Sequence, residues 1–313
     1  AQDAFGNVVT SFTGTIVLAI GANPGGATLG GTTSVGAVAG VATFSTLTLS
    51  NGGTGYTLVA TASGLTPATS ASFNVLGGVP SLLAFIVQPI QTAAGSPITP
   101  AVQVEIRDVV GNRVVSATNS VTLAIGTNPG AGTLSGTATV AAVGGVATFA
   151  GLSINSIGAG YTLVATSGAL TSATSAAFTI TAAAPQALVF TTQPPASQTA
   201  GSTFTTVVEA RDALGNRATG FAGSVTIAFG ANPGGGTLSG TLTVAAVAGV
   251  ATFTTPSVDK AASGYSLTAT AASLTSAAST SFTIVPAAAS VLAFTVQPLS
   301  TSAGATLSPS VVV

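Results

Sequence analysis

The sequence predicts an all-β protein, built as a tandem array of antiparallel β-sandwich domains. Three observations lead to this fold class. A long pattern recurs along the 313 residues, its segments are short and rich in Val, Ile, Thr and Phe, and clusters of Gly, Pro, Asn and Ser separate them. Val, Ile, Thr and Phe favour half-buried strands, and clusters of Gly, Pro, Asn and Ser favour turns. No stretch has a sustained helical period, and the 39 glycines are too many for helices.

The recurring pattern is as long as a whole domain. Its motifs return at offsets of 105 and then 104 residues, which is too long for one unit of a solenoid. The recurring features are GANPGGATLGG, GTNPGAGTLSG and GANPGGGTLSG from Gly21, Gly126 and Gly230; D-x-x-G-N from Asp3, Asp108 and Asp212; Phe44, Phe149 and Phe253 in VATF; the only tyrosines, Tyr56, Tyr161 and Tyr265; and Phe85, Phe190 and Phe294 shortly before Gln-Pro.

Each copy reads as seven short strands divided by turn signals, which indicates an immunoglobulin-like sandwich. Alternation supports this reading: in AVQVEIRD, Val102, Val104 and Ile106 point to one face, and the polar residues between them point to the other. In the third copy the predicted strands are 187–192, 204–211, 224–229, 241–247, 250–255, 265–271 and 276–285.

The repeat boundaries predict four segments. Residues 1–76 form an incomplete immunoglobulin-like repeat that lacks its first strands, and residues 80–181 and 185–285 form complete repeats. Residues 290–313 hold the first strands of the next repeat.

The last of these segments has no partner within its own repeat. VLAFTVQP from Val291 and TLSPSVVV from Thr306 correspond to the two strands that open the second copy, and Val313 corresponds to Val104. We expect residues 290–313 to extend beyond the third domain as two strands. They would complete a sandwich equivalent to residues 1–76 in the next copy, by covalent continuation or by strand donation.

Composition excludes several classes of function. Charged residues are 4% of the chain, against about 25% in a typical domain, and the net charge is −1. The chain therefore has no basic field for nucleic acid or an anionic membrane, and no acidic field for a cationic partner. The mean hydropathy is +0.71, but runs such as residues 244–251 are far shorter than the ~18 apolar residues of a spanning helix.

The residues that usually carry catalysis are missing from the chain. There is no Cys or His, which leaves no thiolate metal site, no disulfide and no imidazole base. Lys260 is the only lysine, and the other copies have no counterpart to it. We therefore expect no enzyme activity and assign no catalytic, cofactor-binding or metal-binding residue.

The glycine-rich motif resembles a phosphate loop but is better explained as a turn. A phosphate loop follows a strand, opens a helix and usually carries a Lys. Here no Lys follows, and the next predicted element is a strand. We expect Asn-Pro-Gly to form a β-turn, with Pro at the second position and a glycine of positive φ at the third.

Two other motifs invite a binding interpretation. The D-x-x-G-N segments could hold calcium, but calcium prefers six to eight oxygens, and one or two carboxylates beside two arginines make a poor site. We expect the Asp to cap its own turn and the Gly to be left-handed. Glu105 with Arg107, and Glu209 with Arg211, can pair along one strand face. Each Tyr follows a Gly at the head of a strand, which favours a tyrosine corner over a ligand-binding aromatic.

Read in order, these motifs resemble the bacterial immunoglobulin-like repeats of large cell-surface proteins, the group that includes invasin- and intimin-type adhesins. The resemblance is carried by VEIRDVVGNRV, SVTLAIG, GVATF, GYTLVAT and AAFTI of the second copy, and it covers the whole chain. It implies an extracellular or cell-surface stalk, adhesin or fibre and no chemistry.

Two functions follow from this resemblance: a structural, polymer-forming fibre or stalk, whose partners are copies of itself, and an adhesin repeat that binds glycan or protein. The near absence of charge favours the fibre. So does the most divergent segment, residues 255–264, which is small and has no aromatic residue.

Overall fold

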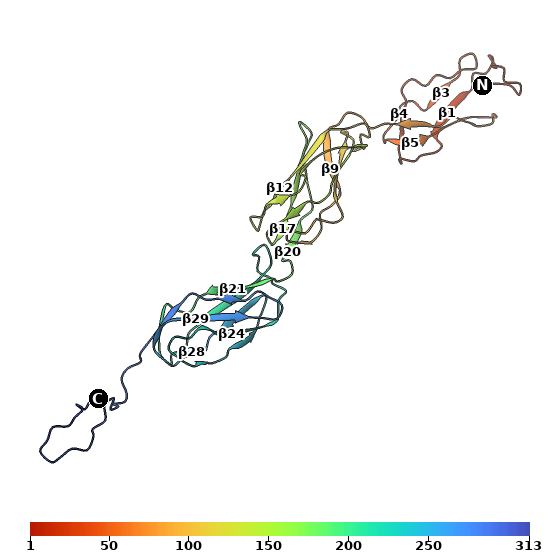
Figure 1. The fold of residues 1–313 in the computed structure, drawn as a ribbon. Helices are drawn as coiled ribbons and strands as arrows, with labels where there is room; N and C mark the ends of the chain where they lie inside the picture. The colour runs from red at the N-terminus through yellow and green to blue at the C-terminus, as the bar shows by residue number, and fades with distance from the viewer. The chain divides into compact units, whose positions relative to one another are not determined.

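The computed structural model describes residues 1–313, and every regular element in it is a β-strand, so the predicted all-β class is confirmed (Figure 1). The chain divides into two compact units, residues 1–183 and residues 184–313. The first unit holds two copies of the repeat, and the second holds one copy and the C-terminal segment. No helix long and apolar enough to cross a membrane is present.

The second repeat is a closed sandwich of two main sheets. One sheet has the order β15-β11-β9, and the facing sheet has the order β14-β12-β18-β19; a separate three-stranded sheet has the order β10-β20-β17. The strands are β9 (Leu82–Val87), β10 (Thr92–Ala93), β11 (Val102–Arg107), β12 (Ser120–Ile125), β13 (Leu134–Ser135), β14 (Thr139–Ala141), β15 (Val146–Phe149), β16 (Ser153–Ile154), β17 (Gly158–Tyr161), β18 (Leu163–Thr166), β19 (Ala173–Thr174) and β20 (Phe178–Thr181).

The core of the second repeat lies between these sheets. β11 alternates as the sequence predicts: Val102, Val104 and Ile106 are fully buried, and the polar residues between them are partly exposed. The facing strands contribute Leu123 and Leu163, which are also buried. An alternating strand thus supplies one apolar face, and two such faces close the domain.

The third repeat has the same design. Its first sheet has the order β21-β23-β27, and its second joins β22-β31-β29-β24-β26, with β30 beside β29. The strands are β21 (Ala187–Thr192), β22 (Ser197–Thr199), β23 (Thr206–Arg211), β24 (Ser224–Ala231), β25 (Leu238–Ser239), β26 (Thr243–Ala245), β27 (Val250–Phe253), β28 (Ser257–Val258), β29 (Ala262–Thr270), β30 (Ala277–Ala278) and β31 (Phe282–Val285).

The sandwich is not wholly antiparallel. After β21 the chain crosses to the other sheet, where β22 runs parallel to β31; β10 and β20 pair in the same way. The sequence predicted neither β22 nor the short pair of β25 and β28. The predicted strand 276–285 is two strands, β30 and β31, because its two ends pair with different parts of β29.

The first repeat has only one of the two main sheets. Its order β3-β1-β6-β7 corresponds to the β14-β12-β18-β19 sheet of the second repeat, and the counterparts of β9, β11 and β15 are missing as strands. Its strands are β1 (Thr15–Ile20), β2 (Leu29–Gly30), β3 (Ser34–Gly36), β4 (Thr48–Leu49), β5 (Gly53–Tyr56), β6 (Leu58–Ala62), β7 (Ala68–Thr69) and β8 (Phe73–Val75).

The C-terminal segment, residues 290–313, contains less strand than the sequence predicts. Instead of two strands it has a single antiparallel bridge between Val296 and Val312, supported by a hydrogen bond of 2.8 Å from Thr295 N–H to the Val312 carbonyl. Its side chains are largely exposed, with Leu292 at 88% and Phe294 at 54%. These two residues are paired, but the segment forms no regular strand.

The difference in closure predicts a difference in the cost of core truncation. Phe149 is fully buried, so Phe149→Ala should lower the free energy of unfolding of the second repeat by about 3–5 kcal/mol. The equivalent Phe44 is only partly buried, so Phe44→Ala should cost the first repeat much less. Urea unfolding followed by circular dichroism, with resolved transitions, measures both; equal losses would contradict the open form of the first repeat.

Candidate assembly interface

The D-x-x-G-N motif forms the same capped turn in all three repeats. In the second repeat, the Val110 and Asn112 N–H groups donate to Asp108 Oδ1 at 3.0 and 2.8 Å. The Gly111 N–H donates to the Asp108 carbonyl at 3.1 Å, and Gly111 has a φ of 96°. The predicted turn chemistry is therefore present: the carboxylate caps the backbone, and the glycine takes the left-handed conformation that other residues adopt at a cost.

Asp108 and Asn112 also bind the preceding repeat. The Gly78 N–H, in the segment that links the two repeats, donates to Asp108 Oδ2 at 2.9 Å. The Gly52 N–H of the first repeat donates to Asn112 Oδ1 at 3.1 Å, and Asn112 Nδ2 donates to the Ser50 carbonyl at 3.2 Å. We call these three hydrogen bonds the repeat clasp.

The clasp lowers the pKa of the Asp108 carboxyl. The hydrogen bond from Gly78 lowers the pKa of the Asp108 carboxyl below its ordinary value of 3.8; burial opposes this effect, and the bonds from Asn112 and Val110 add to it. Hydrogen bonds to the ionised form favour that form. Asp108 is therefore a carboxylate at neutral pH and holds the linker through that charge.

The few charged side chains pair along the strand next to this turn. Arg107 Nε lies 2.6 Å from Glu105 Oε2, Arg113 Nε lies 3.7 Å from Glu105 Oε1, and Arg211 and Glu209 are 3.3 Å apart. The pairing predicted within each strand is observed. Such partly exposed pairs contribute about 0–1 kcal/mol each, and no group of three or more potential metal-ligating side chains comes together.

The three tyrosines form tyrosine corners, as predicted. Each hydroxyl donates to the carbonyl five residues upstream: Tyr56 to Asn51 at 2.9 Å, Tyr161 to Ser156 at 2.9 Å, and Tyr265 to Lys260 at 2.8 Å. All three rings are fully buried. They act as core residues that fix the loop before the strand.

The turn predicted for Asn-Pro-Gly is correct, but the position of its left-handed residue was wrong. In the second repeat, the positive φ of 48° falls on Ala131, one place later than predicted. Gly130 has a different role: a Cβ there would collide with the Tyr161 hydroxyl and the Ile157 carbonyl. Asn128 closes the loop by accepting from the Gly132 N–H at 2.7 Å and donating to the Gly132 carbonyl at 2.9 Å.

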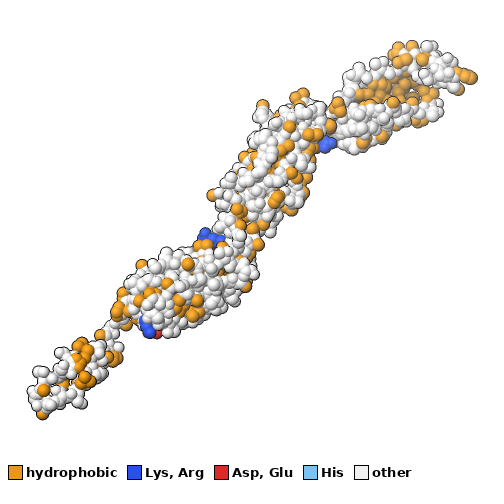
Figure 2. Space-filling view, viewed as in Figure 1, with side chains coloured by type: hydrophobic (Ala, Val, Ile, Leu, Met, Phe, Trp, Pro, Cys, Tyr) orange, Lys and Arg blue, Asp and Glu red, His pale blue; other side chains and the backbone are white.

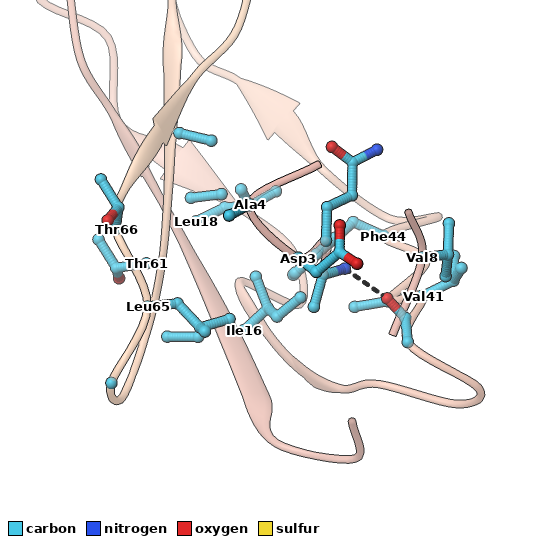
Figure 3. A pocket seen from close by; sticks show the side chains of 18 residues that line it. Asp3, Ala4, Val8, Ile16, Leu18, Val41, Phe44, Thr61, Leu65 and Thr66 are labelled. Carbon is cyan, nitrogen blue, oxygen red and sulfur yellow. Dashed lines mark hydrogen bonds between the residues drawn. The ribbon is translucent and has the colours of Figure 1, made fainter. Parts of the chain in front are cut away.

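The missing sheet leaves a groove in the first repeat. The groove has a volume of about 850 Å³, and Figure 2 shows hydrophobic side chains gathered in this hollow. Figure 3 shows Ile16 and Leu18 of β1 on its inside, with Phe44 and Leu65 along its walls. We call this cavity the open groove.

Residues that line the open groove correspond to buried core residues of the second repeat. Leu18 corresponds to Leu123, which is 2% exposed, and Phe44 corresponds to the fully buried Phe149. Both residues of the first repeat are only partly buried. The sequence did not indicate the repeat clasp, because Asp and Asn in a turn motif carry no signal of a contact about 60 residues away.

Comparisons with known proteins return proteins of similar fold. No protein-family model and no curated protein matches the sequence. Among solved structures, the adhesin FdeC of Escherichia coli is 17% identical, with 92% of this chain and 90% of that one covered and a TM-score of 0.43. Invasin, described as a bacterial integrin-binding protein, is 17% identical, with 91% and 55% covered and a TM-score of 0.35.

The similar structures also include an enzyme. A β-glycosidase from Bacteroides vulgatus is 13% identical, with 66% of this chain and 25% of that chain covered and a TM-score of 0.29. Sandwich domains of this kind serve many unrelated functions. The function of this chain therefore has to be argued from its own residues.

The clasp predicts that the Gly52 amide exchanges its hydrogen faster when the Asn112 side chain is truncated. Asn112→Ala deletes the acceptor of the Gly52 N–H, and the lost net hydrogen-bond energy of about 0.5–1.5 kcal/mol should speed its hydrogen exchange by roughly 2- to 12-fold. The matched control is Asn7→Ala, since Asn7 makes the same bonds to Asp3 within its own turn. Exchange followed by NMR should leave Gly52 unchanged in that control; equal acceleration in both variants would refute the clasp.

The lowered pKa of Asp108 predicts acid sensitivity. A carboxyl whose pKa is lower in the folded state contributes stability above its unfolded-state pKa, and this stability is lost as the pH falls through the folded-state value. The melting temperature should therefore be higher for the wild type than for Asp108→Asn at pH 6, and the two values should converge toward pH 2. A difference that is the same at both pH values would show that the charge does not stabilise the junction.

Proposed function

We propose that the chain is a structural stalk or fibre at the cell surface or outside the cell, in which immunoglobulin-like repeats are the links. The observation that carries this proposal is the repeat clasp. Asp108 and Asn112 belong to a motif found in every repeat, and they bind three backbone groups of the preceding repeat and its linker. The motif recurs in each repeat, and in the second repeat it fastens the repeat to the preceding one, which suits a chain that keeps its links in a defined order.

The surface supports assembly among copies of the same chain. Charged residues are 4% of the sequence, so there is little electrostatic repulsion to keep copies apart. The sheet edges also lack the lysines that commonly prevent edge-to-edge pairing, because Lys260 is the only lysine. The partners we propose are therefore other copies, through head-to-tail or lateral contacts.

Force spectroscopy tests the role as a mechanical link. A closed sandwich should resist force and then unfold in one step, releasing roughly 300 Å of chain for a repeat of about 100 residues. We expect two similar peaks, from the second and third repeats. Gradual lengthening without peaks would contradict a structural link.

A binding experiment separates the stalk from the adhesin. A glycan array and a panel of extracellular matrix proteins, probed with the full chain, should give no signal above that of a denatured control. Saturable binding that maps to one loop set would favour the adhesin over the structural fibre. Labelling of intact source cells with an antibody to the repeats tests the surface location, and signal only after permeabilisation would contradict it.

A further inference from the structure

The clasp holds a loop that contains the only Asn-Gly pair of the chain, Asn51 followed by Gly52. In the second and third repeats, Ser156 and Lys260 stand in the place of Asn51. An asparagine that precedes a glycine readily loses its side-chain amide, because no Cβ on the next residue keeps the backbone nitrogen from reaching the asparagine Cγ. The sequence therefore places a reactive pair in the loop of the first repeat that touches the second repeat.

The reaction at such a pair is a ring closure followed by hydrolysis, with water as the co-reactant. The Gly52 nitrogen gives its proton to solvent and bonds to Asn51 Cγ with its electron pair. The bond between Cγ and Nδ2 then breaks, and Nδ2 takes a proton from solvent and leaves as ammonia. Water opens the resulting succinimide at one of its two carbonyls. Opening at Cγ gives aspartate, and opening at the main-chain carbonyl gives isoaspartate, whose backbone runs through Cβ and Cγ.

The folded chain keeps both reacting groups bound to other partners. The Gly52 N–H donates to Asn112 Oδ1 at 3.1 Å, and Asn51 Nδ2 donates to the Gly25 carbonyl at 2.9 Å. The Ser50 hydroxyl donates to Asn51 Oδ1 at 3.0 Å. The oxygen of an amide side chain accepts a hydrogen bond but does not remove the proton. The bond to Asn112 therefore has to open before the Gly52 nitrogen can attack.

The peptide unit between Asn51 and Gly52 is held at both ends. The fully buried Tyr56 donates its hydroxyl to the Asn51 carbonyl at 2.9 Å, and Asn112 accepts from the Gly52 N–H. Tyr56 belongs to the same repeat as the pair, whereas Asn112 belongs to the next one. Asn51 and Gly52 are partly exposed, so water reaches them. Opening of the junction thus frees the nucleophile without disturbing the tyrosine corner.

We propose that Asn51 is a deamidation site whose rate of conversion is set by the clasp. While the second repeat holds the Gly52 N–H, the asparagine persists; when the junction opens, it converts to aspartate or isoaspartate. Both products carry a carboxylate, which accepts hydrogen bonds only and cannot donate to the Gly25 carbonyl. Isoaspartate also adds a methylene to the backbone before Gly52. The conversion therefore makes a transient opening of the junction permanent. This proposal rests on the clasp and not on the proposed stalk function.

Deamidation rates of the full chain test the restraint. The chain is incubated at mildly alkaline pH, and conversion at Asn51 is followed by peptide mapping with mass spectrometry. Asn112→Ala should raise the rate roughly 2- to 12-fold, as expected for the loss of one hydrogen bond. Hydrogen exchange of the Gly52 amide should rise by the same factor, because both processes require the same local opening. The wild type unfolded in urea should convert faster than either folded protein.

Two control variants separate the clasp from general effects. Asn7→Ala removes the same bonds to Asp3 within one turn and should leave conversion at Asn51 unchanged. Asn51→Ser introduces the residue found at this position in the second repeat and should abolish the product. No conversion in urea would show that the pair is not reactive, and equal rates in the wild type, Asn112→Ala and urea would show that the clasp does not restrain it. Either result overturns the proposal.

The converted protein shows whether the change loosens the junction. Conversion adds one negative charge to a chain whose net charge is −1, so anion exchange separates the converted fraction from the rest. In this fraction the Gly52 amide should exchange as fast as in Asn112→Ala, since the bond between Gly52 and Asn112 is lost. Exchange as slow as in the unconverted wild type would show that the clasp survives the modification, and it would overturn the proposed permanent opening.

Discussion

The pairing of one strand with two neighbours determines whether a repeat becomes a domain. In the second repeat β11 lies between β9 and β15 and covers the opposite sheet with Val102, Val104 and Ile106, all fully buried. The same arrangement of β21, β23 and β27 closes the third repeat. Where this sheet is missing, as in the first repeat, the facing sheet still forms, but its inner side chains line a groove instead of a core. The sandwich is therefore closed when the β11 sheet covers the inner face of a sheet that can form without it.

The turn that follows the central strand β11 connects closure within one repeat to attachment of the previous one. Asp108 uses Oδ1 to cap its own turn and Oδ2 to hold Gly78 in the linker. Asn112 similarly contacts Asp108 and the loop at residues 50–52. Since only 4% of the chain is charged, orientation at this junction depends on directional hydrogen bonds. These bonds are less sensitive to salt than long-range attraction between exposed charges.

At the other end of the repeat, buried tyrosines fix the loops through hydrogen bonds to the backbone. Tyr161 donates to Ser156, and its hydroxyl lies against Gly130 of the turn that begins at Asn128. The glycine-rich motif is thus packed onto the tyrosine corner. Together with the D-x-x-G-N turn it gives these recurring polar residues a role within the fold.

The sequence by itself determined the period, the all-β class, the alternation of strands such as β11, the capped turns and the tyrosine corners, because each depends on residues close together in the chain. Only the tertiary structure decided which of these segments become strands. VATF occurs three times; it is a strand at Val146–Phe149 and Val250–Phe253 and not at residues 41–44. The clasp between Asn112 and Gly52 and the constraint on Gly130 also appear only in three dimensions. The physical reason is that a strand is completed by the backbone hydrogen bonds of a partner, and that partner can lie far away in the sequence.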